Sequence, residues 1–173
     1  MESHNSGIKN PVFRGRAWCF GDDIDTDQIY PGKYLPLTDK VEMAKHAMEG
    51  TDRGEEFLKH VQPGDIIVAG KNFGCGSSRE HAAIAIKGAG INLVIAESFA
   101  RIFHRNCVNT ALITLELKEA KEINDGDILE VNVDTGEVNN LTQGKRYKAA
   151  PLSELEKEII NAGGLLKYLK SAG

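Results

Sequence analysis

The middle of the chain alternates short apolar runs with stretches in which apolar residues recur at helical spacing. Residues 66–69, 93–96 and 111–115 each predict a strand, and the uninterrupted apolar character of the first indicates burial on both faces. Between these runs, the spacing predicts a helix over residues 79–87 and a second helix that Ser98 caps. Strands and helices in this order are typical of βαβ units, so the sequence predicts an α/β fold.

The N-terminal part combines a polar start with one strand, an acidic turn and a helix. Residues 1–10 are polar and without periodicity, which favours a flexible leader. A short strand is predicted at residues 17–20, before an acidic turn at residues 21–27. Thr38 then caps a predicted helix that ends at Gly50.

The C-terminal part predicts a meander followed by two helices. Short strands at residues 128–133 and 137–141 flank a tight turn, and we expect them at the edge of the sheet. Ser153 and Glu156 have the spacing of a capping box, which predicts the start of an amphipathic helix. A last short helix is predicted at residues 165–169.

Composition narrows the classes of protein to consider. A length of 173 residues suits one domain, which we expect over residues 11–173. The formal charge of -4 comes from interspersed acidic and basic residues, and no run approaches the ~20 apolar residues of a membrane span, so neither a nucleic-acid nor a membrane partner is expected. Three isolated cysteines without a secretory segment indicate the reducing cytoplasm.

Residues 70–82 are the most informative segment, because a glycine-rich loop follows a strand and leads directly into a buried helix. Glycines let the backbone approach a ligand, the N-H groups at a helix N-terminus favour an anion, and Arg79 adds a planar donor suited to a carboxylate. The segment is no P-loop, dinucleotide fingerprint or nucleophile elbow, because Gly76, Arg79 and Glu80 stand where those motifs need other residues. A plainer alternative is a capping box of Ser77 and Glu80, with Arg79 paired to a surface carboxylate.

Two further chemistries compete for nearby residues. Aspartates alternate over residues 23–27 like the start of a calcium loop, but the glycine and glutamate needed at the sixth and twelfth positions are missing. Cys75 lies next to the helix terminus, where a thiol is acidified, so thiol catalysis with His81 or His104 is an alternative. A cysteine that merely lines the loop is the commoner case.

Three stretches in the right order carry a family resemblance. Residues 72–83 closely resemble the signature of the swivelling domain of the aconitase superfamily, and residues 96–103 and the turn Asp25-Thr26-Asp27 resemble two further parts of it. The resemblance runs over about residues 15–117, and the chain is similar in length to the separate small subunits of 3-isopropylmalate dehydratase and its relatives. It implies a swivelling domain, in which helices flank a mixed sheet.

The resemblance also implies roles for individual residues. Ser77 matches the general base of the family, and Ser78 and Arg79 match substrate-binding positions. Asp27 is implied to lie near the active site, although a turn-forming or helix-capping aspartate is an equally ordinary interpretation. The [4Fe-4S] cluster of the family is bound by a large subunit and not by this chain, whose isolated cysteines lack the close spacing of cluster ligands. The chain is therefore expected to be a hydro-lyase subunit that is active only with this partner.

The substrate is inferred from Tyr34, Leu35, Pro36 and Leu37, in the loop where this family recognises the variable group of a hydroxy-dicarboxylate. An apolar loop cannot compensate the burial of a further carboxylate, but it gains from covering methyl groups. We therefore expect an alkyl-substituted malate, namely 3-isopropylmalate or 2-isopropylmalate in leucine biosynthesis. A 2,3-dimethylmalate dehydratase small subunit, a homoaconitase small subunit and a carboxylate-binding module without catalysis are the alternatives.

Overall fold

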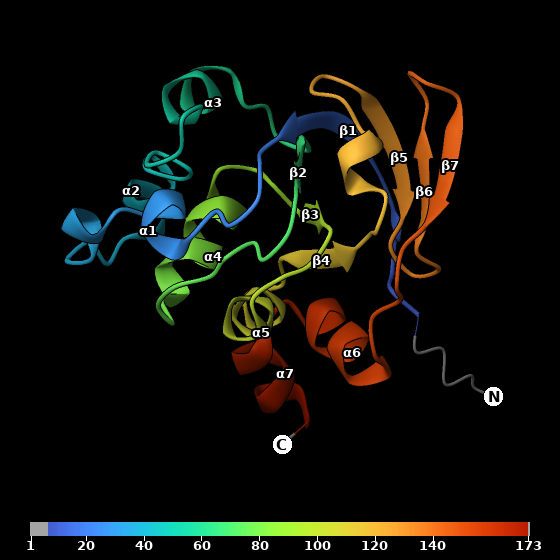
Figure 1. Cartoon of the computed structure of the whole chain (residues 1–173). Coiled ribbons are helices and arrows are strands. Elements are labelled where there is room, and N and C mark those ends of the chain that lie inside the picture. The colour runs from blue at the N-terminus through green and yellow to red at the C-terminus, as the bar shows by residue number, and fades with distance from the viewer. Residues whose placement is uncertain (1–6, 173) are drawn as a thin grey trace.

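A seven-stranded sheet with the order β4-β3-β2-β1-β5-β6-β7 forms the centre of the computed structural model, which describes residues 7–172 (Figure 1). The strands are β1 (Val12–Cys19), β2 (Ile66–Ala69), β3 (Leu93–Ala96), β4 (Ile113–Glu116), β5 (Ile128–Asn132), β6 (Glu137–Asn140) and β7 (Lys145–Lys148). Neighbouring strands among β1 to β4 pair in parallel, whereas β1 with β5, β5 with β6 and β6 with β7 pair antiparallel. The expected mixed sheet is confirmed.

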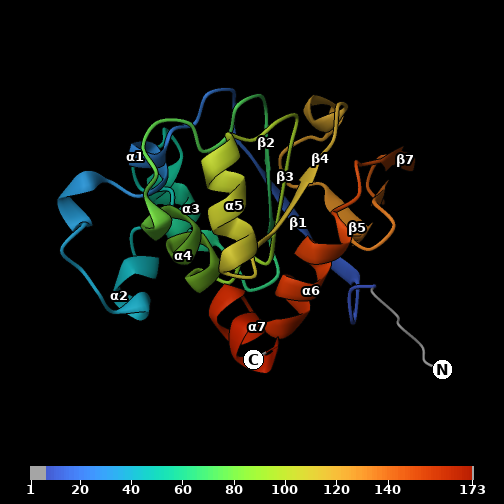
Figure 2. The ribbon, with the colours of Figure 1, turned by 90° about the horizontal axis from the view of Figure 1, so that it is seen from below.

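Helices cover the parallel half of the sheet. They are α1 (Thr26–Ile29), α2 (Lys40–Ala44), α3 (Gly54–His60), α4 (Glu80–Gly88), α5 (Arg101–Asn109), α6 (Glu154–Ala162) and α7 (Leu165–Ala172), with short 3-10 turns η1 (Gly32–Tyr34) and η2 (Ala120–Glu122). Figures 1 and 2 show α1 to α4 together on one side, β5 to β7 on the other side, and α5 between α4 and α6. No helix in the described part of the chain is both long and apolar enough to cross a membrane.

The sheet carries an apolar core on each face. In β2, Ile67 and Ala69 belong to the cluster beneath the helices, whereas Ile66 and Val68 belong to the cluster shared with β5 and β6. All four side chains are buried, which explains why this strand lacks the polar alternation of a one-sided sheet. Burial on both faces fixes the register of β2 and thereby the position of the loop that follows it.

Three connections meet at the carboxyl edge of the parallel strands. The N-H of Gly70, after β2, donates to the carbonyl oxygen of Gly21, after β1, at 3.1 Å. The N-H of Glu97, after β3, donates to the carbonyl oxygen of Gly70 at 3.0 Å. The glycine-rich loop therefore lies between the other two stretches that carry motifs, at the edge where open parallel sheets bind their ligands.

Several element boundaries differ from the sequence predictions. The strand expected at residues 17–20 is the longer β1, because its first half pairs with β5. The helix expected to reach Gly50 is only the short α2, and Asp39 caps it in place of Thr38. The short α3 and β7 have no counterpart in the predictions. Ser98 does not cap α5, since Ala100 precedes that helix and the Ser98 Oγ accepts the N-H of Asn72 at 2.8 Å.

Only the last four residues of the expected leader at residues 1–10 belong to the part of the chain that the structure describes. Residues 1–6 lie outside the described residues. Ile8 is buried, and its N-H donates to Asp134 Oδ1 at 2.9 Å. The N-H of Lys9 donates to Asn161 Oδ1, also at 2.9 Å. Together with the carbonyl oxygen of Gly7, which accepts from Asn161 Nδ2 at 2.9 Å, these contacts join residues 7–9 to the rest of the domain.

Candidate active site

A short parallel bridge joins the acidic turn to the glycine-rich loop. The N-H of Gly74 donates to the carbonyl oxygen of Ile24 at 2.7 Å, and the N-H of Thr26 donates to the carbonyl oxygen of Cys75 at 2.8 Å. Asp25 caps α1 at the same point, with its side chain accepting the N-H of Gln28. Two stretches that are about fifty positions apart in the sequence are thereby held in a fixed relation.

Ser77 lies directly against Thr26. The two hydroxyl oxygens, Ser77 Oγ and Thr26 Oγ1, are 3.1 Å apart, and the N-H of Ser77 donates to Thr26 Oγ1 at 3.2 Å. Ser77 is exposed, whereas Thr26 is buried. The capping-box alternative for Ser77 is wrong, because α4 begins at Glu80 and no side chain of the described residues caps it.

Arg79 and Asp27 form an ion pair beside this serine. Arg79 Nη1 donates to Asp27 Oδ1 at 2.9 Å and to the carbonyl oxygen of Tyr30 at 3.2 Å. The same Asp27 oxygen accepts the N-H of Gly32 at 2.8 Å. The hydrogen bond from Arg79, reinforced by that from Gly32, lowers the pKa of Asp27 below its ordinary value. Asp27 therefore contacts both the arginine and the first N-H of η1, and the N-cap of α1 is Asp25.

Close backbone packing fixes the shape of the loop. Gly74 has a φ of +86°, and a Cβ at this position would overlap Cγ of the buried Phe103. Gly76 has a φ of +103° and faces Thr26 Oγ1. On the other side, Asn106 Nδ2 of α5 donates to the carbonyl oxygen of Ser78 at 3.3 Å. The loop is thus held between α1 and α5.

The four residues of the expected substrate loop divide into two pairs. Tyr34 is anchored, because its hydroxyl donates to Glu49 Oε2 at 2.6 Å and its ring stacks on His46 with 3.5 Å between ring centroids. The carboxylate of Glu49 raises the pKa of Tyr34. Leu37 packs partly against the core, whereas Leu35 and Pro36 are exposed. Leu35 and Pro36 are therefore the members available to a ligand.

The cysteines do not have the properties of reactive thiols. Burial, followed by the charges of Asp25 and Asp23, raises the pKa of Cys75, which is opposite to the acidified thiol of the alternative hypothesis. The two histidines of that hypothesis have other contacts: His81 stacks on Tyr30, and the ring nitrogens of His104 lie 2.7 Å from Thr114 Oγ1 and 2.6 Å from Glu156 Oε2.

Metal binding by this chain is not indicated by its ligand side chains. Cys107 is buried and Cys19 is partly buried, and burial raises the pKa of Cys19 to about 12 and that of Cys107 well above its ordinary value. Within residues 7–172, no three side chains of His, Cys, Asp or Glu are grouped so that they could hold a metal ion. Thiolate ligands for a cubane cluster are therefore not assembled here.

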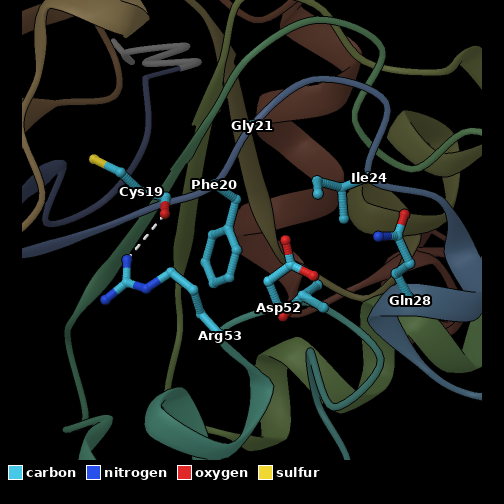
Figure 3. A pocket seen from close by; sticks show the side chains of 8 residues that line it. Cys19, Phe20, Gly21, Ile24, Gln28, Asp52 and Arg53 are labelled. Atoms are coloured by element: carbon cyan, nitrogen blue, oxygen red, sulfur yellow. Dashed lines mark hydrogen bonds between the residues drawn. The ribbon is translucent and has the colours of Figure 1, made fainter.

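A separate cavity of about 240 Å³ lies behind the acidic turn, between the end of β1 and the start of α3 (Figure 3). Its lining includes Phe20, Ile24 and Arg53. The guanidinium of Arg53 donates to the carbonyl oxygen of Cys19 at 3.0 Å and to Asp125 Oδ2 at 3.0 Å. This arginine is therefore engaged within the chain.

Two residues of the site were given no definite role from the sequence. Thr26 lies within a turn that matched the resemblance, but its uncharged hydroxyl drew no separate assignment. Asn106 is one of several polar residues on an amphipathic helix, and its contact with Ser78 depends on packing between α5 and the loop. The position of Thr26, a small polar residue between two aspartates of a matched turn, is the signal that could have identified it.

Comparisons with known proteins agree closely with one another. The sequence matches the aconitase C-terminal domain family over residues 19–120. It is 55% identical over 160 residues to the isopropylmalate/citramalate isomerase small subunit of Methanocaldococcus jannaschii, covering 92% of this chain and 94% of that protein. It is 53% identical to 3-isopropylmalate dehydratase small subunit 1 of Thermotoga maritima, covering 94% of this chain and 97% of the relative. A crystal structure of 3-isopropylmalate dehydratase from Methanocaldococcus jannaschii is similar with a TM-score of 0.89 and 53% identity, covering 93% of this chain and 95% of the other.

Proposed function

The chain belongs to the aconitase C-terminal domain family, and from this membership we propose that it is the small subunit of a hydro-lyase that interconverts 3-isopropylmalate and 2-isopropylmalate. The resemblance indicated by the motifs and the swivelling-domain fold are both confirmed. The proposed reaction removes water from one alkyl-substituted malate and adds it back to give the other, as a step of leucine biosynthesis. Relatives of similar length carry names that refer to this reaction.

The observation that carries the proposal is that residues of one acidic turn hold both Ser77 and Arg79 in place. Thr26 contacts the serine and Asp27 contacts the arginine, so a hydroxyl and a guanidinium lie on one short loop. Dehydration next to a carboxylate requires a base for the carbon-bound proton and fixed donors for the carboxylate, whose negative charge increases. We assign Ser77 as the general base, and Ser78 and Arg79 as carboxylate-binding residues.

Asp27 has a supporting role in this assignment. It accepts from Nη1 of Arg79, so within the described chain the Nε and Nη2 edge of the guanidinium has no hydrogen-bond acceptor. That edge has the spacing of two carboxylate oxygens, which suits a bidentate pair with substrate. The lowered pKa of Asp27 keeps its carboxylate ionised at neutral pH, so the arginine stays oriented.

The substrate class follows from the loop at residues 34–37. Leu35 is 37% exposed, and Pro36 beside it is also exposed, so both can cover an alkyl group. Covering a methylene contributes about 0.8 kcal/mol, whereas an additional carboxylate there would lose its hydration without compensation. Tyr34 and Leu37 hold the loop by their contacts with Glu49 and the core.

The partner supplies the remaining chemistry. Dehydratases of the aconitase superfamily depend on an iron-sulfur cluster, and the three isolated cysteines of this chain lack the close spacing of the ligand set of such a cluster. We therefore assign the [4Fe-4S] cluster to a large subunit. The exposed loop with Ser77 and Ser78 would face that subunit across the substrate.

The test is anaerobic co-expression with the large subunit, followed by measurement of alkene formation from 3-isopropylmalate. Citramalate, 2,3-dimethylmalate and homocitrate are compared in the same assay. The Ser77→Ala variant removes the proposed base, and Ser171→Ala is the matched control, because Ser171 is another exposed serine, on α7. We expect highest kcat/KM with 3-isopropylmalate, loss of turnover in Ser77→Ala and unchanged turnover in Ser171→Ala.

Other outcomes would reassign the protein. Higher kcat/KM with 2,3-dimethylmalate or homocitrate would replace the substrate but keep the reaction class. Full turnover in Ser77→Ala would remove the serine from catalysis. Carboxylate binding by the chain alone, without turnover after the large subunit is added, would favour a binding module.

A further inference from the structure

The hydroxyl of Thr26 is a buried donor that lies against the proposed base. Thr26 is only 2% exposed, so water does not compete for its hydroxyl. Its Oγ1 accepts the N-H of Ser77 at 3.2 Å and lies 3.1 Å from Ser77 Oγ. A threonine hydroxyl has one proton to donate and two lone pairs. Because the N-H of Ser77 occupies one lone pair, the single proton of Thr26 is free to point at Ser77 Oγ.

The backbone holds this hydroxyl in place from several directions. The N-H of Thr26 donates to the carbonyl oxygen of Cys75 at 2.8 Å, and the carbonyl oxygen of Thr26 accepts the N-H of Tyr30 at 2.8 Å. Gly76 leaves room for the hydroxyl, since a Cβ there would lie 3.3 Å from Thr26 Oγ1. A donor fixed in this way needs little reorganisation when charge develops on its acceptor.

The protonation state of Ser77 decides the direction of the hydrogen bond. A neutral serine can either donate to Thr26 or accept from it. A deprotonated serine oxygen can only accept a hydrogen bond. Because the two hydroxyl oxygens are already 3.1 Å apart, Thr26 can donate to it without a change in the position of either side chain. The interaction is therefore strongest in the basic form of Ser77, because hydrogen bonds to an ionised acceptor are roughly twice as strong as neutral ones.

We infer that Thr26 is a positioning residue that orients Ser77 and stabilises its basic form. The inference rests on the proposed function, in which the Ser77 oxygen takes the proton from the substrate carbon while the electron pair of that C-H bond stays on the substrate. Thr26 keeps its own proton throughout. Its contribution is to hold the serine oxygen and to lower the pKa of the serine hydroxyl.

The test compares Thr26→Val, which removes the donor with little change of volume, with Thr26→Ser, which retains it. Thr114→Val is the matched control, because Thr114 on β4 is also 2% exposed but its hydroxyl contacts His104 of α5 and not Ser77. All variants are measured as the complex with the large subunit, with kcat and KM determined across the pH range in which wild type is active. Thermal unfolding of each variant is recorded in parallel.

We expect Thr26→Val to lower kcat about 100-fold, the lower end of the effect of removing one donor to a developing oxyanion, with little change in KM. The pH at which kcat rises should move to higher values, because the serine loses a donor to its basic form. Thr26→Ser should restore most of kcat and the original pH profile. Thr114→Val should keep both.

Failure of this inference and failure of the proposed function are distinguishable. An active wild type and an inactive Ser77→Ala variant, together with an unchanged pH profile in Thr26→Val, would overturn the role of Thr26 alone. A decrease of kcat in Thr26→Val that Thr26→Ser does not rescue would also overturn it, since packing and not the donor would then be responsible. Wild-type turnover in Ser77→Ala would instead overturn the proposed function.

Discussion

Replacement of Arg79 by lysine tests the carboxylate site most directly, because it keeps the charge and changes only the donors. Arginine carries five N-H donors in a planar fork. The Nη1 atom makes two hydrogen bonds, to Asp27 and to the carbonyl oxygen of Tyr30, which leaves the Nε and Nη2 donors for substrate. A lysine has three donors. If it keeps both contacts within the chain, it can offer the substrate one donor in place of a bidentate pair.

The expected loss is one hydrogen bond to a charged group, about 1.5–3 kcal/mol. At about 1.4 kcal/mol per factor of ten, Arg79→Lys should lower kcat/KM by about 10-fold to 150-fold. The measurement is the initial rate against 3-isopropylmalate concentration for the anaerobic complex. Arg146→Lys on the exposed strand β7 is the matched control and should match wild type. A value of kcat/KM for Arg79→Lys within about threefold of wild type would refute bidentate binding, since the lost interaction would then be too weak.

Three further predictions concern the surroundings of the site. Cys75→Ser should keep wild-type kcat, because its raised thiol pKa is unsuited to a nucleophile, and a large loss in the same rate assay would revive thiol catalysis. Gly74→Ala should lower the free energy of unfolding in urea by at least about 2 kcal/mol, because a Cβ would clash with Phe103 at a φ of +86°. Burial raises the pKa of Cys19 from 9.0 to about 12, so as the pH rises the unfolded chain loses the thiol proton at a lower pH than the folded chain. The free energy of unfolding should therefore fall between pH 9 and 12. Urea unfolding of Cys19→Ser should show a smaller fall than wild type.

The central elements were predictable because one local signal dominates each of them. The runs at residues 66–69 and 93–96 are apolar at every position, and burial on both faces is the structure in which such strands are stable. The short α3 carries too few apolar residues for a periodic signal, since Phe57 is its only buried large side chain. Strand β7, with the sequence Lys-Arg-Tyr-Lys, pairs with β6, and Tyr147 is its one residue of a type that favours strands, which is too weak a local signal to predict it.

For the candidate site too, local sequence predicted some features, whereas others depend on contacts between distant residues. The glycine-rich loop was visible from its composition, but the partners of Ser77 and Arg79 come from a turn about fifty positions away. Local spacing therefore favoured a capping box of Ser77 with Glu80, whereas the structure pairs the serine with Thr26. The choice depends on the parallel bridge between Asp25 and Cys75, which continues the parallel pairing of β1 with β2 beyond the ends of both strands.

The contacts within this chain set the geometry of the site, whereas the basicity of Ser77 depends on the exclusion of water. The contacts of Ser77 and Arg79 with Thr26 and Asp27 lie within one chain, so their relative positions are set before substrate or partner arrives. Ser77 and Ser78 are nevertheless exposed, and a serine hydroxyl in contact with water is a very weak source of a base. Removal of water by a closing surface strengthens the effect of each nearby donor, because the local dielectric falls. The large subunit therefore has two tasks in the proposed enzyme, to complete the ligand set around the substrate and to exclude water from a serine that this chain has already oriented.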